Sequence, residues 1–265
     1  MPRGPLRFHV RPTLREPALL LALEGWNDAG EAASTAVRFV AGEIGAAPLA
    51  EIDPEPYFDF TVRRPLVRVE DGIARGLEWP DCRFGYAAAP AAPGAEPRDL
   101  VTCDGVEPHL RWRDWSEHLL HLVDELGIRR VVLLGAFLGE VLYSRPVDVT
   151  GVASEPELLA SLGVEPVRYA GPTGMIGVLG QRLRDRGCRV AALWAGLPHY
   201  VEVSPNPRGA LALLERALPF LGIELDLEPL RSSARECEER ISAMVSADPE
   251  LSEYVRELKR REFAQ

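Results

Sequence analysis

The sequence RRVVLLGA at residues 129–136 predicts the centre of the fold. Apart from Gly135, every residue after the two arginines is apolar, with no polar residue between them. Continuous apolarity indicates a strand covered on both faces, which is typical of the central strands of a parallel sheet. Residues 113–126 carry apolar side chains at helical spacing, and Gly127 ends that helix. A glycine followed by a buried strand recurs at residues 187–195, so the sequence predicts repeated αβ units.

The flanking segments extend this pattern in both directions. Residues 18–23 predict a buried strand, and residues 25–28 turn the chain into a helix with a stripe of small apolar residues. Further strands are predicted at 49–52, 100–103, 147–152, 167–170 and 190–194. One helix is predicted at 155–162, and the loop at 171–174 opens another that ends at residue 186. Asn206-Pro207 is an N-cap followed by an N1 proline, which begins another helix. The expected class is α/β with a mostly parallel central sheet.

Two segments differ from this αβ pattern. Strand candidates at 58–62, 66–69, 73–79 and 83–87, with the turn signal Asp71-Gly72, predict a β-hairpin insertion at about 57–87. From about Glu228 two apolar stripes, separated by Asp248-Pro249, predict a helical hairpin. We therefore expect an α/β core at residues 1–227 and a C-terminal helical hairpin at 228–265.

The charge and the cysteines restrict the class of partner. The formal net charge is −10, which disfavours nucleic acid and anionic membrane surfaces, because both are bound through cations. The four cysteines are widely separated and form no CxxC pair, which favours a reducing compartment. The N-terminal segment lacks the apolar stretch of a secretion signal. We expect a cytoplasmic protein that contacts neither nucleic acid nor membrane.

Common catalytic motifs are missing from the sequence. Lys259 is the only lysine and lies in the last predicted helix, so no phosphate-binding P-loop is possible. The GxGxxG, GxSxG and HExxH patterns are also absent. Asp114, His118, His121 and Glu125 share one helix face, a spacing that fits either a metal site or the solvated side of an amphipathic helix. The second interpretation is favoured, and we expect no metal, cofactor or catalytic residue.

Three loops at strand-to-helix junctions are the candidate ligand site, because ligands of open parallel sheets bind beyond the carboxyl ends of the strands. Each loop also has a purely structural interpretation. Asp28 and Glu31 fit a capping box, Thr173 fits a helix cap, and His199 fits a structural or interface role. The candidate ligand-binding residues are Trp26, Asn27, Asp28, Pro172, Thr173, Gly174, His199 and Tyr200.

Taken together, the junction motifs resemble those of the PAC2 family of proteasome-assembly-chaperone-like proteins, and in particular its actinobacterial branch. The similar motifs run in order over about residues 18–220, and the acidic helical tail is similar too. They are GWNDAG at 25–30, YFDF at 57–60, RP at 64–65, GVEP at 105–108, RW at 111–112, LLGA at 133–136, RPV at 145–147, GPTG at 171–174 and PHY at 198–200.

The resemblance implies a three-layer α/β/α core like that of nucleoside phosphorylases and peptidyl-tRNA hydrolases, assembled as a homo-oligomer such as a trimer. It implies no catalytic residue. Archaeal and eukaryotic relatives assist proteasome assembly, and some bind the proteasome through a carboxyl terminus of the form hydrophobic-Tyr-X. This sequence has Glu262-Phe263-Ala264-Gln265, with alanine in place of that tyrosine.

The sequence therefore supports two alternative functions. The favoured one is a non-enzymatic oligomeric protein that acts through protein–protein interaction, with a client or proteasome-related partner. The alternative is a small-ligand binder or enzyme that uses the three loops, with a nucleoside or phosphate-bearing ligand as the first expectation from fold analogy.

Overall fold

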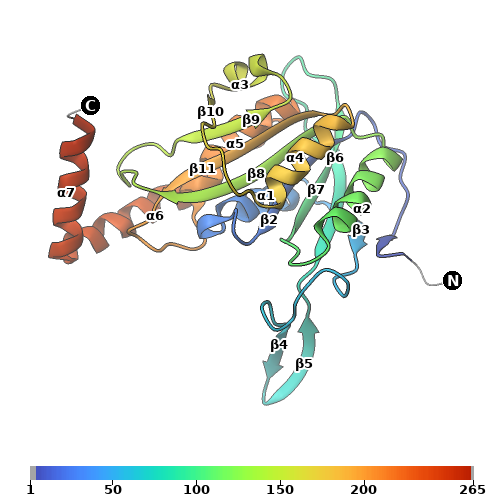
Figure 1. Cartoon of the computed structure of the whole chain (residues 1–265), viewed down its shortest axis with the longest axis horizontal. Coiled ribbons are helices and arrows are strands. Elements are labelled where there is room, and N and C mark those ends of the chain that lie inside the picture. The colour runs from blue at the N-terminus through green and yellow to red at the C-terminus, as the bar shows by residue number, and fades with distance from the viewer. Residues whose placement is uncertain (1–3, 264–265) are drawn as a thin grey trace.

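A computed structural model describes residues 4–263 of the chain, which form a mixed nine-stranded sheet flanked by helices (Figure 1). The strands lie side by side in the following order: β1 (Leu6–Phe8), β3 (Ala47–Ile52), β6 (Cys82–Ala89), β7 (Arg98–Val106), β2 (Ala18–Glu24), β8 (Arg130–Gly139), β11 (Arg189–Pro198), β9 (Val149–Ala153) and β10 (Glu165–Pro166). The predicted central strand is confirmed, because β8 lies between β2 and β11.

The parallel part of the sheet is its centre. Strands β7, β2, β8 and β11 pair in parallel, whereas β1, β3 and β6 on one side and β9 on the other are joined by antiparallel pairings. The four parallel strands therefore end at one common edge, where their connections to the helices begin. This arrangement brings distant loops of the sequence together.

Helices cover both faces of the sheet, which confirms the three-layer α/β/α architecture. One face packs against α1 (Ala32–Glu43), α3 (Pro156–Leu162) and α5 (Pro207–Leu221), and the other against α2 (Trp112–Glu125) and α4 (Met175–Asp185). Successive residues of β8 enter opposite cores: Val132 and Leu134 lie in the first, and Val131 and Leu133 in the second. This two-sided burial explains why the sequence of β8 shows no alternation.

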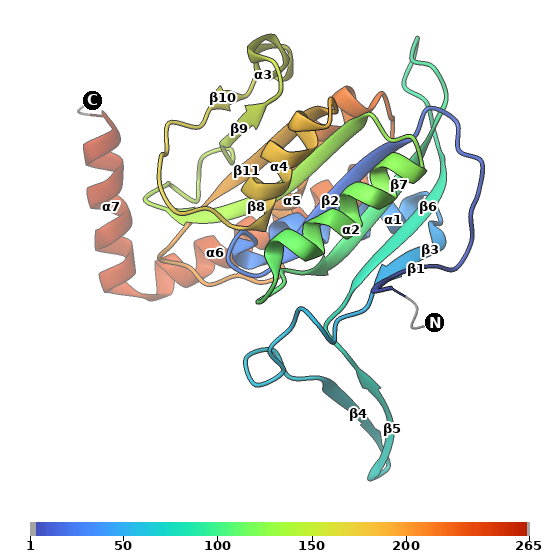
Figure 2. The same cartoon turned by 45° about the vertical axis from the view of Figure 1, so that its right-hand side comes forward.

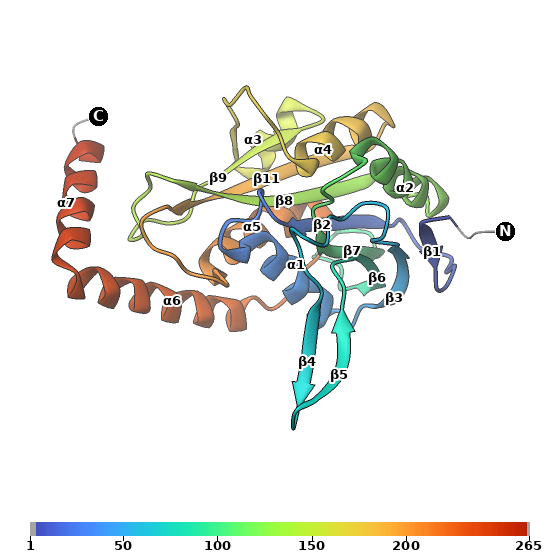
Figure 3. The same ribbon diagram turned by 60° about the horizontal axis from the view of Figure 1, so that its bottom comes forward.

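The hairpin insertion is shorter than the predicted 57–87. Only β4 (Leu66–Glu70) and β5 (Ile73–Glu78) form a separate two-stranded sheet, which projects from the body (Figures 1, 2 and 3). The predicted strand at 83–87 belongs to β6 of the main sheet, where Cys82 is the register partner of Ile52. The prediction of a strand at 58–62 is wrong, because this segment forms turns with Phe58 buried in the core.

The two predicted C-terminal helices are present on either side of Asp248, and they open into an L rather than lying side by side (Figure 3). Helix α6 (Glu228–Ala247) packs on α5, while α7 (Pro249–Phe263) contributes Val255 to a small cluster with Ile241 and Val201. The Asp248 carboxylate caps α7 by accepting bonds from the first-turn amides. Ala264 and Gln265, part of the tail sequence discussed above, lie outside the described residues.

Candidate functional site

The loop after β2 is attached to the central strand at the carboxyl edge of the sheet. The carbonyl of Asn27 accepts a 2.6 Å hydrogen bond from the Ala136 amide of β8. Gly135 makes this approach possible, since a Cβ at that position would lie 2.5 Å from the Trp194 ring and 3.0 Å from the Asn27 carbonyl. The Asn27 side chain is thereby fixed beside Trp194, whose indole N–H is 3.4 Å from its Oδ1.

Glu107, just beyond β7, provides the N-terminal cap of α4. Its Oε1 accepts a 2.6 Å hydrogen bond from the Met175 amide and lies 3.4 Å from Asn27 Nδ2. Gly174 has no room for a side chain here, because its Cβ would lie 1.8 Å from Asn27 Nδ2. Glu107 belongs to the GVEP motif of the family resemblance, yet the sequence alone assigned it no role. The side chains of Asn27, Glu107 and Trp194 thus close one end of α4.

Thr173 does not cap α4, contrary to the structural interpretation of its position. The N-cap residue is Gly174, with no side-chain cap, and Thr173 Oγ1 lies 3.5 Å from the Gly174 carbonyl. The cap comes from Glu107 instead, far away in the sequence. The first-turn amide of α4 is therefore already bonded to a carboxylate, and the negative charge there opposes a bound phosphate.

Asp28 is a buried helix-capping residue of α1. Its carboxylate accepts hydrogen bonds from the Ala33 amide at 2.7 Å and the Ser34 hydroxyl at 2.6 Å. Burial raises the pKa of Asp28 and the Ser34 bond opposes that rise. The predicted pairing with Glu31 is wrong, because the Glu31 carboxylate instead accepts from Ser204 and lies 3.2 Å from Arg38.

A charged cluster around Arg38 lies on the α1 side of the same edge. The guanidinium is 2.9 Å from Glu24 and 3.4 Å from Asp104. Burial, with Arg38 opposing it, raises the pKa of Asp104 to about 6, and the buried Asp104 Oδ1 has no hydrogen-bond partner among the described residues. Asp104 is thus a carboxyl whose charge changes in mildly acidic conditions.

His199 and Tyr200 lie apart from the other candidates and contact α7. The imidazole Nδ1 is 3.1 Å from the Gly139 carbonyl, and Nε2 is 3.3 Å from the Tyr254 hydroxyl. The Tyr200 hydroxyl donates to the Val141 carbonyl and accepts from the Tyr143 amide, and burial raises its pKa. These contacts attach α7 to the loop after β8, which agrees with the structural interpretation of His199.

A pocket of about 920 Å³ brings together four of the eight candidates. Trp26, Asn27, Pro172 and Thr173 line one end of it, beside Trp194. Residues of α4, β9 and β11 and the segment 165–171 also line the pocket. In that segment the predicted strand at 167–170 is wrong, because the structure has only the two-residue strand β10. The volume is within the range of about 300–1,000 Å³ that is typical of small-molecule sites.

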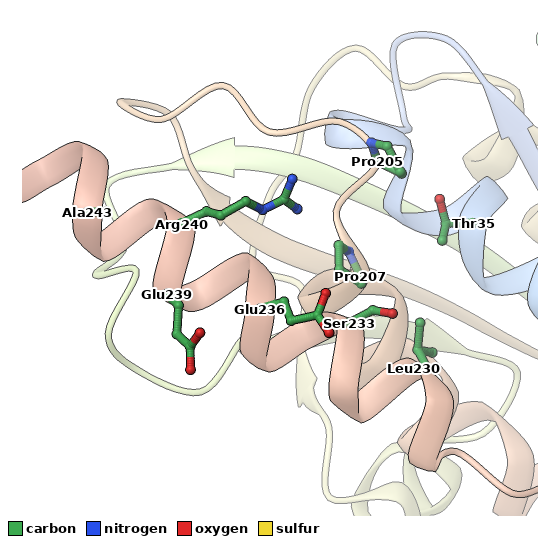
Figure 4. Close-up of a pocket in the computed structure, with 9 residues that line it drawn as sticks. All are labelled: Thr35, Pro205, Pro207, Leu230, Ser233, Glu236, Glu239, Arg240 and Ala243. Carbon is green, nitrogen blue, oxygen red and sulfur yellow. The ribbon is translucent and has the colours of Figure 1, made fainter.

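A second pocket, of about 730 Å³, lies between α6 and the loop that precedes α5 (Figure 4). Its lining is largely the polar side of α6, including Glu236, Glu239 and Arg240, and contains none of the candidate residues. The Ser233 hydroxyl donates to the Pro229 carbonyl within the same helix. No group that lines this pocket forms an arrangement suited to catalysis.

Polar side chains of α2 form hydrogen bonds with segments that lie far away in the sequence. Asp114 accepts a hydrogen bond from Tyr57 at 3.0 Å, and Glu125 accepts one from Arg11 at 2.7 Å. Burial lowers the pKa of His118. Across residues 4–263 no group of three or more histidine, cysteine or acidic side chains could hold a metal ion. In the same part of the chain, no helix has the combined length and apolarity that crossing a membrane requires.

Comparison with known proteins identifies the family. The sequence model of the PAC2 family matches residues 22–245. The chain belongs to the PAC2 family. This confirms the resemblance drawn from the junction motifs. No protein of curated function matches the sequence.

Two solved PAC2 relatives are 40% identical to this chain. They are the proteasome-assembly chaperone homologue Rv2125 of Mycobacterium tuberculosis and a PAC2 family protein of Streptomyces avermitilis; each alignment has a TM-score of 0.80 and covers 90% of this chain and 99% of the relative. The archaeal proteasome activator PbaB of Pyrococcus furiosus shares the fold at 20% identity and a TM-score of 0.71, over 90% of this chain and 97% of its own. Both actinobacterial relatives thus match this PAC2 chain over almost their whole length.

Proposed function

We propose that this chain is a non-enzymatic, homo-oligomeric protein of the proteasome-assembly-chaperone type, which acts in the cytoplasm by binding other proteins. Its family and its identity to a proteasome-assembly chaperone homologue support this role. The four cysteines are widely separated in the sequence and form no CxxC pair, which supports a reducing compartment. The observation that carries the proposal is the exposed apolar surface of the β4–β5 hairpin.

Every residue of β4 and β5 is exposed, although many are apolar. Leu66 is 66% exposed and Leu77 is 59% exposed. The large exposed apolar residues of this region are Val62, Leu66, Val67, Val69, Ile73, Leu77 and Trp79. A two-stranded hairpin is only marginally stable alone, and contiguous apolar patches on soluble proteins mark interaction sites. The hairpin therefore supports a protein contact.

The two faces of β4 differ in chemistry. Val67 and Leu77 are register partners, so their side chains lie on one face of the hairpin. Arg68 lies on the opposite face and forms an ion pair with Glu78. We assign the Val67–Leu77 face to the contact with a second copy of the chain, since a homo-oligomer buries the same apolar surface in every subunit.

Light scattering on the purified chain tests this assignment. We expect a mass that is a multiple of 29.2 kDa, with three copies as the first expectation. The double variant Val67→Ser and Leu77→Ser should have the mass of one chain, whereas Arg68→Gln, on the other face, should keep the oligomer. Unchanged circular dichroism would show that the variants fold. A wild-type chain of monomer mass would contradict the oligomer.

Reconstitution tests the chaperone role itself. Proteasome subunits from the same organism should assemble faster in the presence of the wild-type chain than in its absence. The hairpin double variant should lose this effect, and the Arg68→Gln variant should keep it. Assembly at the same rate with and without the chain would contradict the role.

Binding of a small ligand is a second candidate function, and the pocket beside Trp194 favours it. A nucleoside or phosphate ligand is the first expectation from fold analogy, and the negative charge of Glu107 at the end of α4 opposes the phosphate. A thermal-shift panel of nucleosides, nucleotides and inorganic phosphate tests this ligand class. A ligand at a hundred times its dissociation constant should stabilise the native state by about 2.7 kcal/mol. We expect no shift with inorganic phosphate, which carries the same sign of charge as Glu107, whereas a shift with a nucleoside would support this second function.

A further inference from the structure

The pocket beside Trp194 is elongated and follows α4, and it is called the α4 groove below. Its floor is formed by β11 and β9, which are antiparallel neighbours with Thr150 opposite Trp194 and Val152 opposite Ala192. One wall is α4, and the other is the loop of residues 165–173, which runs from β10 to the start of α4 (Figure 2). The groove exists because α4 covers the central strands of this face and leaves β9 without a helix above it.

Small residues on α4 keep the groove open. Gly177 and Gly180 line it one helical turn apart. A Cβ on Gly177 would lie 2.0 Å from Thr173 Oγ1, in the loop that forms the other wall. A Cβ on Gly180 would make only ordinary contacts, 3.7 Å from Leu133 and 3.9 Å from Ala192. From Val190 to Trp194 the floor spans about 13 Å, at about 3.3 Å per residue of a strand. An elongated ligand therefore fits it.

The end of the groove at the sheet edge is aromatic and exposed. Trp26 is 67% exposed, Phe137 is 43% exposed and Tyr169 is 63% exposed. These side chains line the groove together with Trp194. Exposed aromatic groups around one cavity favour the binding of an apolar or aromatic group, since its burial removes their surface from water.

The groove is also lined by charged residues, namely Arg168, Arg184 and Glu165. Arg184, near the end of α4, and Arg168, in the covering loop, both line it. Arg184 donates to the Gln181 side chain, and within residues 4–263 no carboxylate oxygen lies within 4.0 Å of either guanidinium. Most of this acidic protein's other arginines form ion pairs. Two guanidinium groups free of carboxylates at one cavity point to an anionic group of the ligand.

We propose that the α4 groove binds an amphipathic organic carboxylate as a free small molecule. Its carboxylate contacts Arg184 in the last turn of α4, and its apolar body lies over Ala192 and ends at Trp194. The opposite orientation would place the carboxylate beside Glu107, which is unfavourable between like charges. This assignment deepens the second candidate function and is independent of the hairpin contact.

Fluorescence titration with dansylaminoundecanoate tests the assignment, since the dye is bright only in an apolar site. We expect saturable binding to the wild-type chain and displacement by decanoate. Decylamine, which has the same chain and the opposite charge, should displace the probe poorly. A phenylalkanoate competitor compares aromatic with aliphatic bodies of the same charge.

Substitutions in the chain show whether the probe binds in the α4 groove. Gly180→Leu should abolish binding by filling the groove, whereas Gly180→Ala, the matched control, should bind as the wild type does. Arg184→Gln should weaken binding about tenfold, which is the loss of one charge-assisted hydrogen bond of about 1.4 kcal/mol. Arg186→Gln removes the same charge from a side chain that pairs with Glu117 and Asp124 outside the groove, and should have no effect.

Three results would overturn the proposal. The first is no saturable binding to the wild-type chain. The second is binding that Gly180→Leu and Arg184→Gln leave unchanged, which would place the probe elsewhere. The third is equal displacement by decylamine and decanoate, which would exclude recognition of the charge. The hairpin double variant should still bind the probe, so failure of this proposal is distinguishable from failure of the oligomer.

Discussion

Replacing Glu107 with alanine would remove the cap that joins β7 to α4. The wild-type carboxylate accepts a 2.6 Å bond from the Met175 amide, and no other side chain among residues 4–263 caps this helix. Loss of an N-cap acceptor costs about 1 kcal/mol, and loss of a negative charge at a helix N-terminus costs a further 0.3–1 kcal/mol or so. We expect the free energy of unfolding to fall by about 1–2 kcal/mol.

Thermal unfolding followed by circular dichroism measures this loss. In a chain of this size about 1 kcal/mol corresponds to about 2–4 °C, so Glu107→Ala should lower Tm by about 2–8 °C. Glu107→Gln keeps the hydrogen-bond acceptor and removes only the charge, so it should lower Tm by about half as much or less. The matched control is Glu236→Ala on the exposed side of α6, where a change within about 0.5 kcal/mol is expected.

Two outcomes would refute this reasoning. If Glu107→Ala unfolds at the same temperature as Glu236→Ala, the Met175 bond does not stabilise the fold. If Glu107→Gln costs as much as Glu107→Ala, the charge rather than the hydrogen bond is responsible. The same variants bear on the α4 groove, because a neutral residue at 107 should also allow a ligand carboxylate near the start of α4.

Further changes have equally specific outcomes. Folding raises the pKa of Asp104 from its usual value of about 3.9 to about 6, so the folded state binds that proton more tightly than the unfolded state. The free energy of unfolding therefore falls as pH rises between these two values. Asp104→Asn should remove this pH dependence and stabilise the chain at neutral pH by about 1 kcal/mol in denaturant titrations. Gly174→Ala places a Cβ 1.8 Å from Asn27 Nδ2 and should cost about 1–3 kcal/mol in the same assay, partly relieved by Asn27→Ala. Ile241→Ala, at a position 1% exposed, should cost about 2–4 kcal/mol and reduce the hydrogen-exchange protection of α7.

Each of these expectations can fail in a distinct way. An unchanged pH slope in Asp104→Asn would mean that another carboxyl produces it. A wild-type stability for Gly174→Ala would mean that the Asn27 side chain moves aside without cost. Loss of exchange protection throughout the chain in Ile241→Ala, with no excess in α7, would mean that the last helix does not open separately from the core.

The parts of the fold that depend on local pattern could be predicted. The continuous apolarity of β8 and the Asn206 cap of α5 are properties of neighbouring residues, and both are present, with Asn206 Oδ1 accepting from the Gly209 amide. The destination of residues 83–87 could not be predicted in this way. Alternation identifies a strand but does not indicate which sheet the strand joins. Here the chain leaves the main sheet after Ile52, forms the hairpin and returns to pair Cys82 with Ile52.

The candidate site shows the same limit. Trp26, Asn27, Pro172 and Thr173 could be grouped because parallel strands end at one edge. His199 also follows a strand, yet its Nε2 lies 3.3 Å from the Tyr254 hydroxyl of α7, so this imidazole contacts the last helix and not the pocket. Glu107 acts on an amide 68 residues away, so no local pattern could indicate it.

The register between Ile52 and Cys82 has an evolutionary consequence. These residues face each other across β3 and β6, so the ladder is complete before the chain leaves for the hairpin and after it returns. Between the buried Phe58 and Asp81, whose carbonyl accepts a bond from the Val106 amide of β7, insertions, deletions and substitutions can accumulate without breaking a bond of the main sheet. The projecting segment can therefore change during evolution to bind a new partner while the main sheet stays the same.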